Sequence, residues 1–369
     1  MPPLRYVSSL LVLALATTSM LVVAAEPTVR APRTKKLPVG VSLAGAEFGC
    51  ESPDFSNENP GQLGVDYTFP ESETIKYFTK AGVNVLRIPF RWERIQPKLG
   101  QPLDRQHVSE LRKLSKFARR HRTTLVLDLH NYGRYRLAGV GDCVIDQSVN
   151  GDVPVTRKHF ADLWSRLALE FRHDRSVVGF ALMNEPHDMG GSDWKQISQV
   201  AVDAIRKSDR KTNIFICGDD WGSAERFEKA NGAKAWIKDP ANRTIYEAHC
   251  YFDLDGSGKY QNSFGTENAG DATIADRGVS RIEPFLKWCR RNGVRGFVGE
   301  YGTPRDNGWR QVTLQFLQVC KDANVGVCYW AAGEWWGDYP LSVQPKNSLI
   351  APQLSWLLRI RAMEESNKK

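Results

Sequence analysis

The sequence lacks the short motifs that mark metal, phosphate and dinucleotide sites. Its seven cysteines and seven histidines form no C-x-x-C, H-E-x-x-H or H-x-H group, so no zinc site is expected. No Walker-type loop occurs, and residues 41–49 beside the first predicted strand do not supply G-x-G-x-x-G. We therefore expect no metal, nucleotide or other cofactor.

The chain also has no basic run interleaved with aromatic residues. Its formal net charge is +8, but part of that excess lies in the first 36 residues and the rest is spread thinly. We therefore expect no nucleic-acid partner. With 41% hydrophobic and 25% charged residues, the composition excludes a disordered, collagenous or disulfide-scaffold protein.

Long apolar runs are absent except at the N-terminus. Arg5 precedes a largely apolar stretch over residues 7–25, and small residues at 23–25 come before Glu26. This order is typical of a secretory signal peptide, predicted to span residues 1–25. An uncleaved anchor is the alternative, because the run is about as long as the ~20 residues that cross a bilayer. We expect cleavage and export to the periplasm or the medium, with no stable membrane association afterwards.

An exported compartment permits disulfides. Seven cysteines are an odd number, so at least one is free or pairs with another chain. Cys320 and Cys328 are close enough in sequence to pair, but the spacing leaves the connectivity open.

After a short basic linker over residues 26–38, β-rich runs alternate with amphipathic stretches. Strands are predicted over residues 39–43, 83–89, 124–130, 177–184, 213–218, 244–249, 296–300 and 326–330. Helices are predicted over residues 71–81, 104–121, 156–172, 193–207, 224–237, 279–291, 307–321 and 351–363. This alternation is typical of an α/β protein built as a single (β/α)8 (TIM) barrel, here over residues 39–369, with a doubly wound sheet as the competing arrangement. We expect a monomer with no second domain.

Two glutamates end predicted strands in which the other residues are apolar. Glu185 follows the fourth strand and Glu300 ends the seventh, so both are predicted to project into one cleft at the C-terminal face of the barrel. Paired carboxylates in a cleft indicate glycoside hydrolysis, in which one is protonated and the other ionised. Either glutamate alone could equally cap the next helix, and it is the pair that favours catalysis.

The motifs around these glutamates resemble those of glycoside hydrolase family 5, the cellulase family. Residues 182–186 (LMNEP) resemble its strand-four signature, and residues 297–302 (FVGEYG) resemble its strand-seven signature. Other residues fall where that family places its active-site side chains, in the same chain order, namely Arg87, His130, His249, Tyr251 and Trp330. The resemblance covers essentially all of residues 39–330 and implies the same barrel fold.

The resemblance also implies roles for these residues. Glu185 would be the acid/base and Glu300 the nucleophile of a retaining reaction, with their carboxyl groups ~5–5.5 Å apart. Asn184 would hydrogen-bond the sugar 2-hydroxyl, and Arg87 and Tyr251 would hold the nucleophile ionised and aimed.

Two histidines are expected to support the reaction. His130 and His249 would bind hydroxyls or orient the acid/base, and Asn131 is counted with these supporting residues. The alternative for both histidines is a structural role at a strand end.

Aromatic residues are the expected sugar platform, because the C–H faces of sugar rings pack on indoles. Trp330 is predicted at the subsite of the cleaved sugar, and Trp221, Trp335 and Trp336 at neighbouring subsites. Trp92 is undecided between substrate and packing. Four tryptophans fall in predicted helices and are expected to pack, namely Trp164, Trp236, Trp288 and Trp356.

Within the family, residues 45–49, 128–132 and 253–258 resemble the subfamily with many endo-β-1,4-glucanases. We predict an endo-acting, retaining β-1,4-glucanase (cellulase) that acts on β-glucan chains. Residues 334–338 depart from the small polar run expected there, so a β-mannanase or a mixed-linkage β-glucan hydrolase stays open. A further alternative is a carbohydrate-binding protein on a catalytically dead barrel, against which the intact glutamates argue.

Overall fold

A computed structural model of the protein describes Met1 and residues 37–346 and 350–366, with side chains up to Ile360. Apart from Met1, the predicted signal peptide lies outside these residues, as does nearly all of the predicted linker, and both stay predictions. Among the described residues, no helix is long and apolar enough to cross a membrane.

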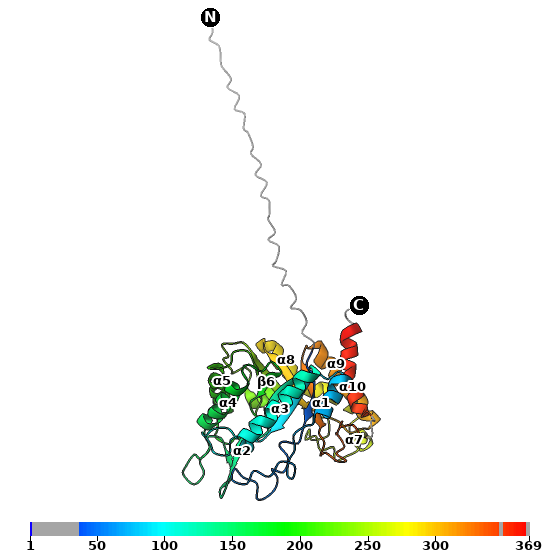
Figure 1. The fold of residues 1–369 in the computed structure, drawn as a ribbon. Helices are drawn as coiled ribbons and strands as arrows, with labels where there is room; N and C mark the ends of the chain where they lie inside the picture. The colour runs from blue at the N-terminus through cyan, green and yellow to red at the C-terminus, as the bar shows by residue number, and fades with distance from the viewer. Residues whose placement is uncertain (2–36, 347–349, 367–369) are drawn as a thin grey trace. The chain divides into compact units, whose positions relative to one another are not determined.

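Eight parallel strands close into a barrel in the spatial order β1-β10-β9-β8-β7-β6-β3-β2. They are β1 (Val39–Leu43), β2 (Val85–Phe90), β3 (Thr124–Leu129), β6 (Val177–Ala181), β7 (Asn213–Cys217), β8 (Thr244–His249), β9 (Arg295–Tyr301) and β10 (Gly326–Ala332). Helices surround this ring on the outside (Figure 1). The predicted (β/α)8 barrel is confirmed, and the open doubly wound sheet is excluded because the strands close on themselves.

The remaining elements connect these strands, except the last helix, which follows β10. They are α1 (Ser72–Ala81), α2 (Trp92–Ile95), α3 (Arg105–His121), α4 (Arg157–Phe171), α5 (Trp194–Arg206), α6 (Phe227–Asn231), α7 (Phe264–Gly270), the 3₁₀ turn η1 (Ile274–Asp276), α8 (Arg277–Asn292), α9 (Asn307–Asp322), α10 (Pro352–Ser366) and an antiparallel hairpin of β4 (Arg134–Leu137) and β5 (Gly141–Val144). Side-chain caps fix several helix starts: Asp104 accepts from the His107 backbone N–H over 2.8 Å, and Thr156 with His159 forms a capping box.

The barrel strands are buried on both faces, which explains their nearly continuous hydrophobic runs. Their outer faces join one large core with the helices. A separate small cluster has one residue from each of six strands, an arrangement available only inside the barrel, and consists of Val85, Val126, Ala181, Phe215, Phe297 and Cys328. The inward position of β2 next after Val85 holds Arg87, which is fully buried.

One helix prediction is wrong in extent. Residues 224–237 were predicted as a single helix, but only α6 is helical there. It ends at Gly232, which has φ +77° and donates its N–H to the Glu228 carbonyl over 2.7 Å. A glycine in that region ends a helix readily, because it has no Cβ to strain. The fourth strand also ends early, at Ala181, although Asn184 still donates its N–H to the Leu129 carbonyl.

All seven cysteines lie in the described part of the chain, and all are free thiols. Six are buried and Cys50 is half-buried. Cys320 and Cys328, which sequence spacing allowed to pair, lie on α9 and β10 as separate thiols.

Candidate active site

Glu185 and Glu300 lie together at the C-terminal end of the barrel. Glu300 is on β9, and Glu185 follows β6 with a left-handed backbone, φ +42°. The flanking backbone is held in place, because Tyr132 donates its N–H to the Asn184 carbonyl and Trp221 donates its own to the Pro186 carbonyl, each over 3.1 Å. One carboxylate oxygen from each glutamate lies within 4.8 Å of the other and of a His249 ring nitrogen. The predicted pair therefore meets in one site.

Arg87 supplies the central positive charge. It donates from Nη1 to Glu300 Oε1 over 2.9 Å and from Nη2 to Asn184 Oδ1 over 2.7 Å. Asp128 and Glu247 complete its surroundings, each with an oxygen 3.2 Å from the guanidinium. With three carboxylates around it, the pKa of this buried guanidinium lies well above its usual value even though burial opposes the charge.

Glu300 is bonded through both of its oxygens. The second oxygen, Oε2, accepts from the Tyr251 hydroxyl over 2.8 Å. Burial raises the pKa of Glu300 above that of an ordinary glutamate, whereas the nearby charges of His249 and Arg87 lower it. The two donors thus favour the ionised form and fix the orientation of the carboxylate.

His249 lies between two carboxylates. Its Nδ1 is 2.7 Å from Glu185 Oε1, and its Nε2 is 3.2 Å from Glu247 Oε1. Burial alone would lower the pKa of this ring, but Glu300, Glu185 and Glu247 raise it to about 10. The ring is therefore an imidazolium that donates on both sides. This position favours the orienting role over a structural one at a strand end.

His130, unlike His249, is uncharged. Its Nδ1 is 2.8 Å from Asp128 Oδ2, and its Nε2 is 3.2 Å from the Asn184 side-chain nitrogen, so the ring donates on one side and accepts on the other. Burial lowers the pKa of His130 to about 3, which keeps the ring neutral. The ring also stacks on Trp330, with 5.3 Å between ring centres and 12° between planes.

The predicted platform residues fall into two groups. Trp330 and Trp336 are half-buried and touch edge to face, with ring centres 5.9 Å apart, and Trp336 also stacks on Tyr339 at 4.3 Å. Trp221 and Trp335 are 42% and 41% exposed, high values for such large apolar side chains.

Trp221 borders a cavity on the Glu185 side of the site. The cavity measures about 440 Å³ and is also lined by Glu185, His249 and Tyr251. The Trp221 indole also stacks on His187, with ring centres 4.4 Å apart and 10° between planes. An indole held flat at the edge of a cavity is suited to packing against a sugar ring.

Asn131 does not join these side chains. Its Oδ1 accepts from the Trp92 backbone N–H over 2.8 Å, and its Nδ2 donates to Glu93 and to the Arg134 carbonyl. The Asn131 amide therefore links the backbone at Trp92 and Arg134 to the Glu93 side chain.

The undecided Trp92 is a packing residue, fully buried against Tyr135 and Phe160. The four tryptophans expected to pack do so, with Trp164, Trp288 and Trp356 buried and Trp236 against Phe227, Tyr246 and Trp288. Trp236 lies in a loop, however, because α6 ends before it.

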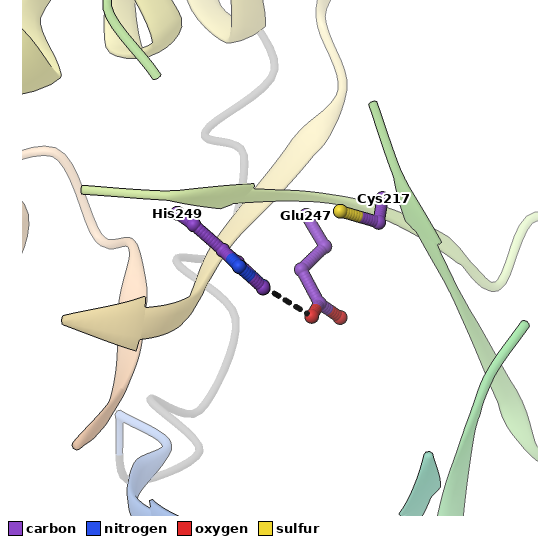
Figure 2. A group of neighbouring side chains, drawn as sticks. All are labelled: Cys217, Glu247 and His249. Atoms are coloured by element: carbon purple, nitrogen blue, oxygen red, sulfur yellow. Dashed lines mark hydrogen bonds and ion pairs between the residues drawn. The ribbon is translucent and has the colours of Figure 1, made fainter. Parts of the chain in front are cut away.

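Two groups of side chains in the described part of the chain are close enough to share a metal ion: Cys217, Glu247 and His249, and Glu185, His249 and Glu300. In the first group, the Glu247 oxygen and the His249 nitrogen are already paired, as Figure 2 shows. Burial raises the pKa of Cys217 well above its usual value, which disfavours the thiolate that metal binding needs. The geometry therefore fits an ion pair beside a neutral thiol.

Comparison with known proteins gives the family of the chain. The cellulase family, glycosyl hydrolase family 5, matches residues 42–335. The chain belongs to glycosyl hydrolase family 5. Endo-beta-1,4-glucanase B of Emericella nidulans is 30% identical over 340 residues, covering 90% of this chain and 94% of the relative. Endo-beta-1,4-glucanase A of the same organism is 31% identical over 326 residues, covering 87% and 91%.

Solved structures of similar proteins share the fold of this family 5 hydrolase. Endoglucanase Cel5A of Pseudomonas stutzeri has a TM-score of 0.75 at 36% identity, covering 87% of this chain and 92% of that one. Endo-beta-1,4-glucanase Xac0029 of Xanthomonas axonopodis pv. citri has a TM-score of 0.77 at 33% identity, covering 88% and 98%. These likenesses confirm the predicted family and barrel.

Sequence reasoning on this family 5 hydrolase missed three polar residues of the site. Asp128 pairs with Arg87 and His130, and Glu247 pairs with Arg87 and His249. The His187 ring stacks on Trp221. A signal for the two carboxylates was present, because Asp128-Leu129-His130 and Glu247-Ala248-His249 both place a carboxylate two residues before a histidine. Residues two apart on a strand share a face.

Proposed function

We propose that this protein is an endo-acting β-1,4-glucanase that cleaves internal bonds of cellulose-like chains with retention at the anomeric carbon. The observation that carries the proposal is the approach of Glu185 and Glu300 to within 4.8 Å, oxygen to oxygen. Retaining glycosidases hold their carboxyl groups about 5–5.5 Å apart, whereas inverting ones leave about 6.5–9.5 Å for a water molecule.

In the first step, the ionised Glu300 attacks the anomeric carbon while Glu185 protonates the departing glycosidic oxygen. Arg87 and Tyr251 hold the Glu300 carboxylate in place through one oxygen each. The bond from the anomeric carbon to the leaving sugar breaks, and an ester to Glu300 forms. Asn184, fixed by Arg87, is the proposed partner of the sugar 2-hydroxyl, a contact that strengthens as positive charge develops on the ring.

In the second step, Glu185 is a carboxylate and takes a proton from a water molecule, which attacks the anomeric carbon and releases Glu300. His249 Nδ1, 2.7 Å from Glu185 Oε1, holds the Glu185 carboxyl group in position for this step. Two displacements at one carbon restore the original β-configuration.

The substrate class rests on the relatives and on the aromatic residues. The two relatives from Emericella nidulans are named as endo-β-1,4-glucanases. Among the similar solved structures, endoglucanase Cel5A of Pseudomonas stutzeri is in complex with cellobiose, and XacCel5A is in complex with cellopentaose. Trp330 supports a sugar in the glycone direction and Trp221 one on the leaving-group side, with Trp335 as a more distant platform. We also propose that the protein is exported after cleavage of residues 1–25 and acts as a monomer.

The test is hydrolysis by the purified mature protein of carboxymethyl-cellulose, barley β-glucan, mannan and xylan. Reducing ends and viscosity are followed together, because internal cleavage lowers viscosity long before many ends are released. Rapid viscosity loss on carboxymethyl-cellulose is expected. Activity on mannan alone would move the substrate to β-mannan, and inactivity on all four polymers would contradict the proposal.

A further inference from the structure

Glu247 is a buried carboxylate in the middle of the site, with no role in the two displacement steps. It lies on β8 two residues before His249, so both side chains leave the strand on the same side (Figure 2). Its side chain is 1% exposed. An ionised carboxylate is costly to bury unless cations or hydrogen-bond donors pair with it.

The carboxylate connects the two cations of the site. Glu247 Oε1 is 3.2 Å from Arg87 Nη2 and 3.2 Å from His249 Nε2, while Oε2 has no hydrogen-bond partner among the residues that the structure describes. Although burial raises the pKa of Glu247, Arg87 and His249 bring it below the ordinary value. Glu247 is therefore an anion, and its contact with His249 is an ion pair.

Gly299 provides the space for this carboxylate. A Cβ atom at Gly299 would lie 2.0 Å from Glu247 Oε1, far inside contact distance. The glycine directly before Glu300 thus keeps β9 clear of the Glu247 side chain. A residue with any side chain at position 299 would displace the carboxylate from His249.

The consequence for catalysis runs through the shared proton of Glu185 and His249. The two groups are 2.7 Å apart, so the Nδ1 proton of the His249 imidazolium can pass directly to Glu185. Glu185 needs that proton for the first displacement step. Once the pair has lost it, the site has no general acid, so the pH of that loss sets the alkaline limit of activity.

We propose that Glu247 is a positioning residue for the acid/base: its carboxylate, held in the space beside Gly299, pairs with Nε2 of His249 and keeps a proton on the Glu185–His249 pair into the alkaline range. The proposal rests on the acid/base role of Glu185 stated above. Removing the Glu247 charge is expected to make the pair lose its proton at lower pH.

Other ionisable groups face Glu247 and His249 from the neighbouring strands. Around Glu247 and His249 they are Arg87 on β2, Asp128 on β3 with His130 beyond it, Glu185 after β6, Cys217 on β7, Glu300 on β9 and Cys328 on β10. The Glu247 variants change none of these residues. Arg87 keeps Asp128, Asn184 and Glu300 as partners, so the Glu300 pKa is expected to fall or stay unchanged.

The variants are Glu247→Gln, which removes the charge, and Glu247→Asp, which keeps it. Asp239→Asn is the matched control, because Asp239 is also a buried carboxylate in an ion pair, 2.9 Å from Arg206, and lies outside the site. The alkaline limb of kcat/KM on a soluble cello-oligosaccharide is measured for each. We expect it to move by about one pH unit or more toward acid in Glu247→Gln, by less in Glu247→Asp and not at all in Asp239→Asn.

A second measurement needs no activity. The imidazole of His249 is titrated by NMR in protein with labelled histidine, after circular dichroism shows that each variant is folded. We expect the ring to stay protonated above pH 8 in the wild type and to lose its proton at least about one pH unit lower in Glu247→Gln. An unchanged titration or an unchanged alkaline limb in folded Glu247→Gln overturns the proposal. Inactivity of the wild type on every glucan would overturn the proposed function instead, and the titration would still decide whether Glu247 controls His249.

Discussion

Nη1 of Arg87 lies 2.9 Å from Oε1 of Glu300, inside a barrel where the arginine side chain is wholly shielded from water. The same guanidinium orients Asn184 through its second terminal nitrogen, Nη2. One buried cation therefore sets both the charge of the proposed nucleophile and the direction of the amide beside it.

Replacing Arg87 is expected to move the acid limb of activity to higher pH. The pKa of Glu300 is already raised by burial, and Arg87 lowers it, so loss of the cation raises it further. Because Glu300 must be ionised to attack, activity is lost at a higher pH as the solution is acidified, by about 1–3 pH units in Arg87→Gln. The measurement is kcat/KM against pH.

Arg87→Lys keeps a positive charge and is expected to show a smaller shift. Arg87→Lys also serves as the control for misfolding, because breaking a buried ion-pair network costs about 3–5 kcal/mol of unfolding free energy. An acid limb identical to that of the wild type in folded Arg87→Gln would refute this role.

Glu300→Gln is expected to separate turnover from binding. The amide has the shape of the carboxylate but cannot form the ester, so kcat should fall on the order of 10⁴-fold or more. Affinity for a cello-oligosaccharide, measured by calorimetry, should change little. Glu283→Gln, at a half-buried carboxylate of α8 outside the site, is the control. Near-normal turnover in Glu300→Gln would remove Glu300 from the mechanism.

The barrel was predictable from the sequence because its strands are buried on both faces. The limits of β1 and β8 were predicted without error, and the other barrel strands differ at their ends by a few residues. Predictions failed where local contacts decide the conformation. The helix over residues 224–237 ends at Gly232, and the hairpin of β4 and β5 is an insertion that the strand-and-helix alternation does not reveal.

The sequence predicted the two glutamates of the candidate site but not the buried carboxylates Asp128 and Glu247. Glu185 and Glu300 stood out because each ends an apolar run. Glu247 has the same alternation as His249, but a carboxylate inside a strand gains its meaning from Arg87, which is 160 positions away in the chain. Asn131 shows the reverse case, since its motif pointed to the substrate while its amide is bonded to Glu93 and Trp92.

Glu47 is expected to make stability fall with rising pH. It is buried near the end of β1, accepts from the Gly45 backbone N–H over 2.8 Å, and has a pKa that burial raises from 4.5 to about 8. A group with a raised folded-state pKa takes up a proton on folding, so its contribution is full below pH 4.5 and is lost as the pH rises toward 8.

Glu47→Gln should therefore remove a slope of up to about 1.4 kcal/mol per pH unit from the free energy of unfolding over that range. Urea unfolding at several pH values measures it. The Gln variant should be more stable than the wild type near pH 8. Equal pH dependence in the two proteins would show that Glu47 is ionised in the folded state.

Glu334 ties the tryptophan-bearing loop after β10 to the start of α1. Its Oε1 accepts from the Glu71 backbone N–H over 3.0 Å and from the Thr74 hydroxyl over 2.6 Å. In the part of the chain that the structure describes, the Glu71 side chain makes no cap of its own. Glu334→Ala should cost about 1 kcal/mol of unfolding free energy, as loss of a helix cap does, and Glu334→Gln less, since an acceptor oxygen stays. Equal stability of the Ala variant and the wild type in urea would refute the cap.

The stereochemistry of the first product tests the central claim most directly. Proton NMR of a cello-oligosaccharide digest, recorded within the first minutes before mutarotation, reports the anomer released by the wild-type protein. The account predicts the β-anomer, because Glu300 and Glu185 act in two displacements at one carbon. Initial release of the α-anomer would mean a single displacement by water and would contradict the role of Glu300 as nucleophile.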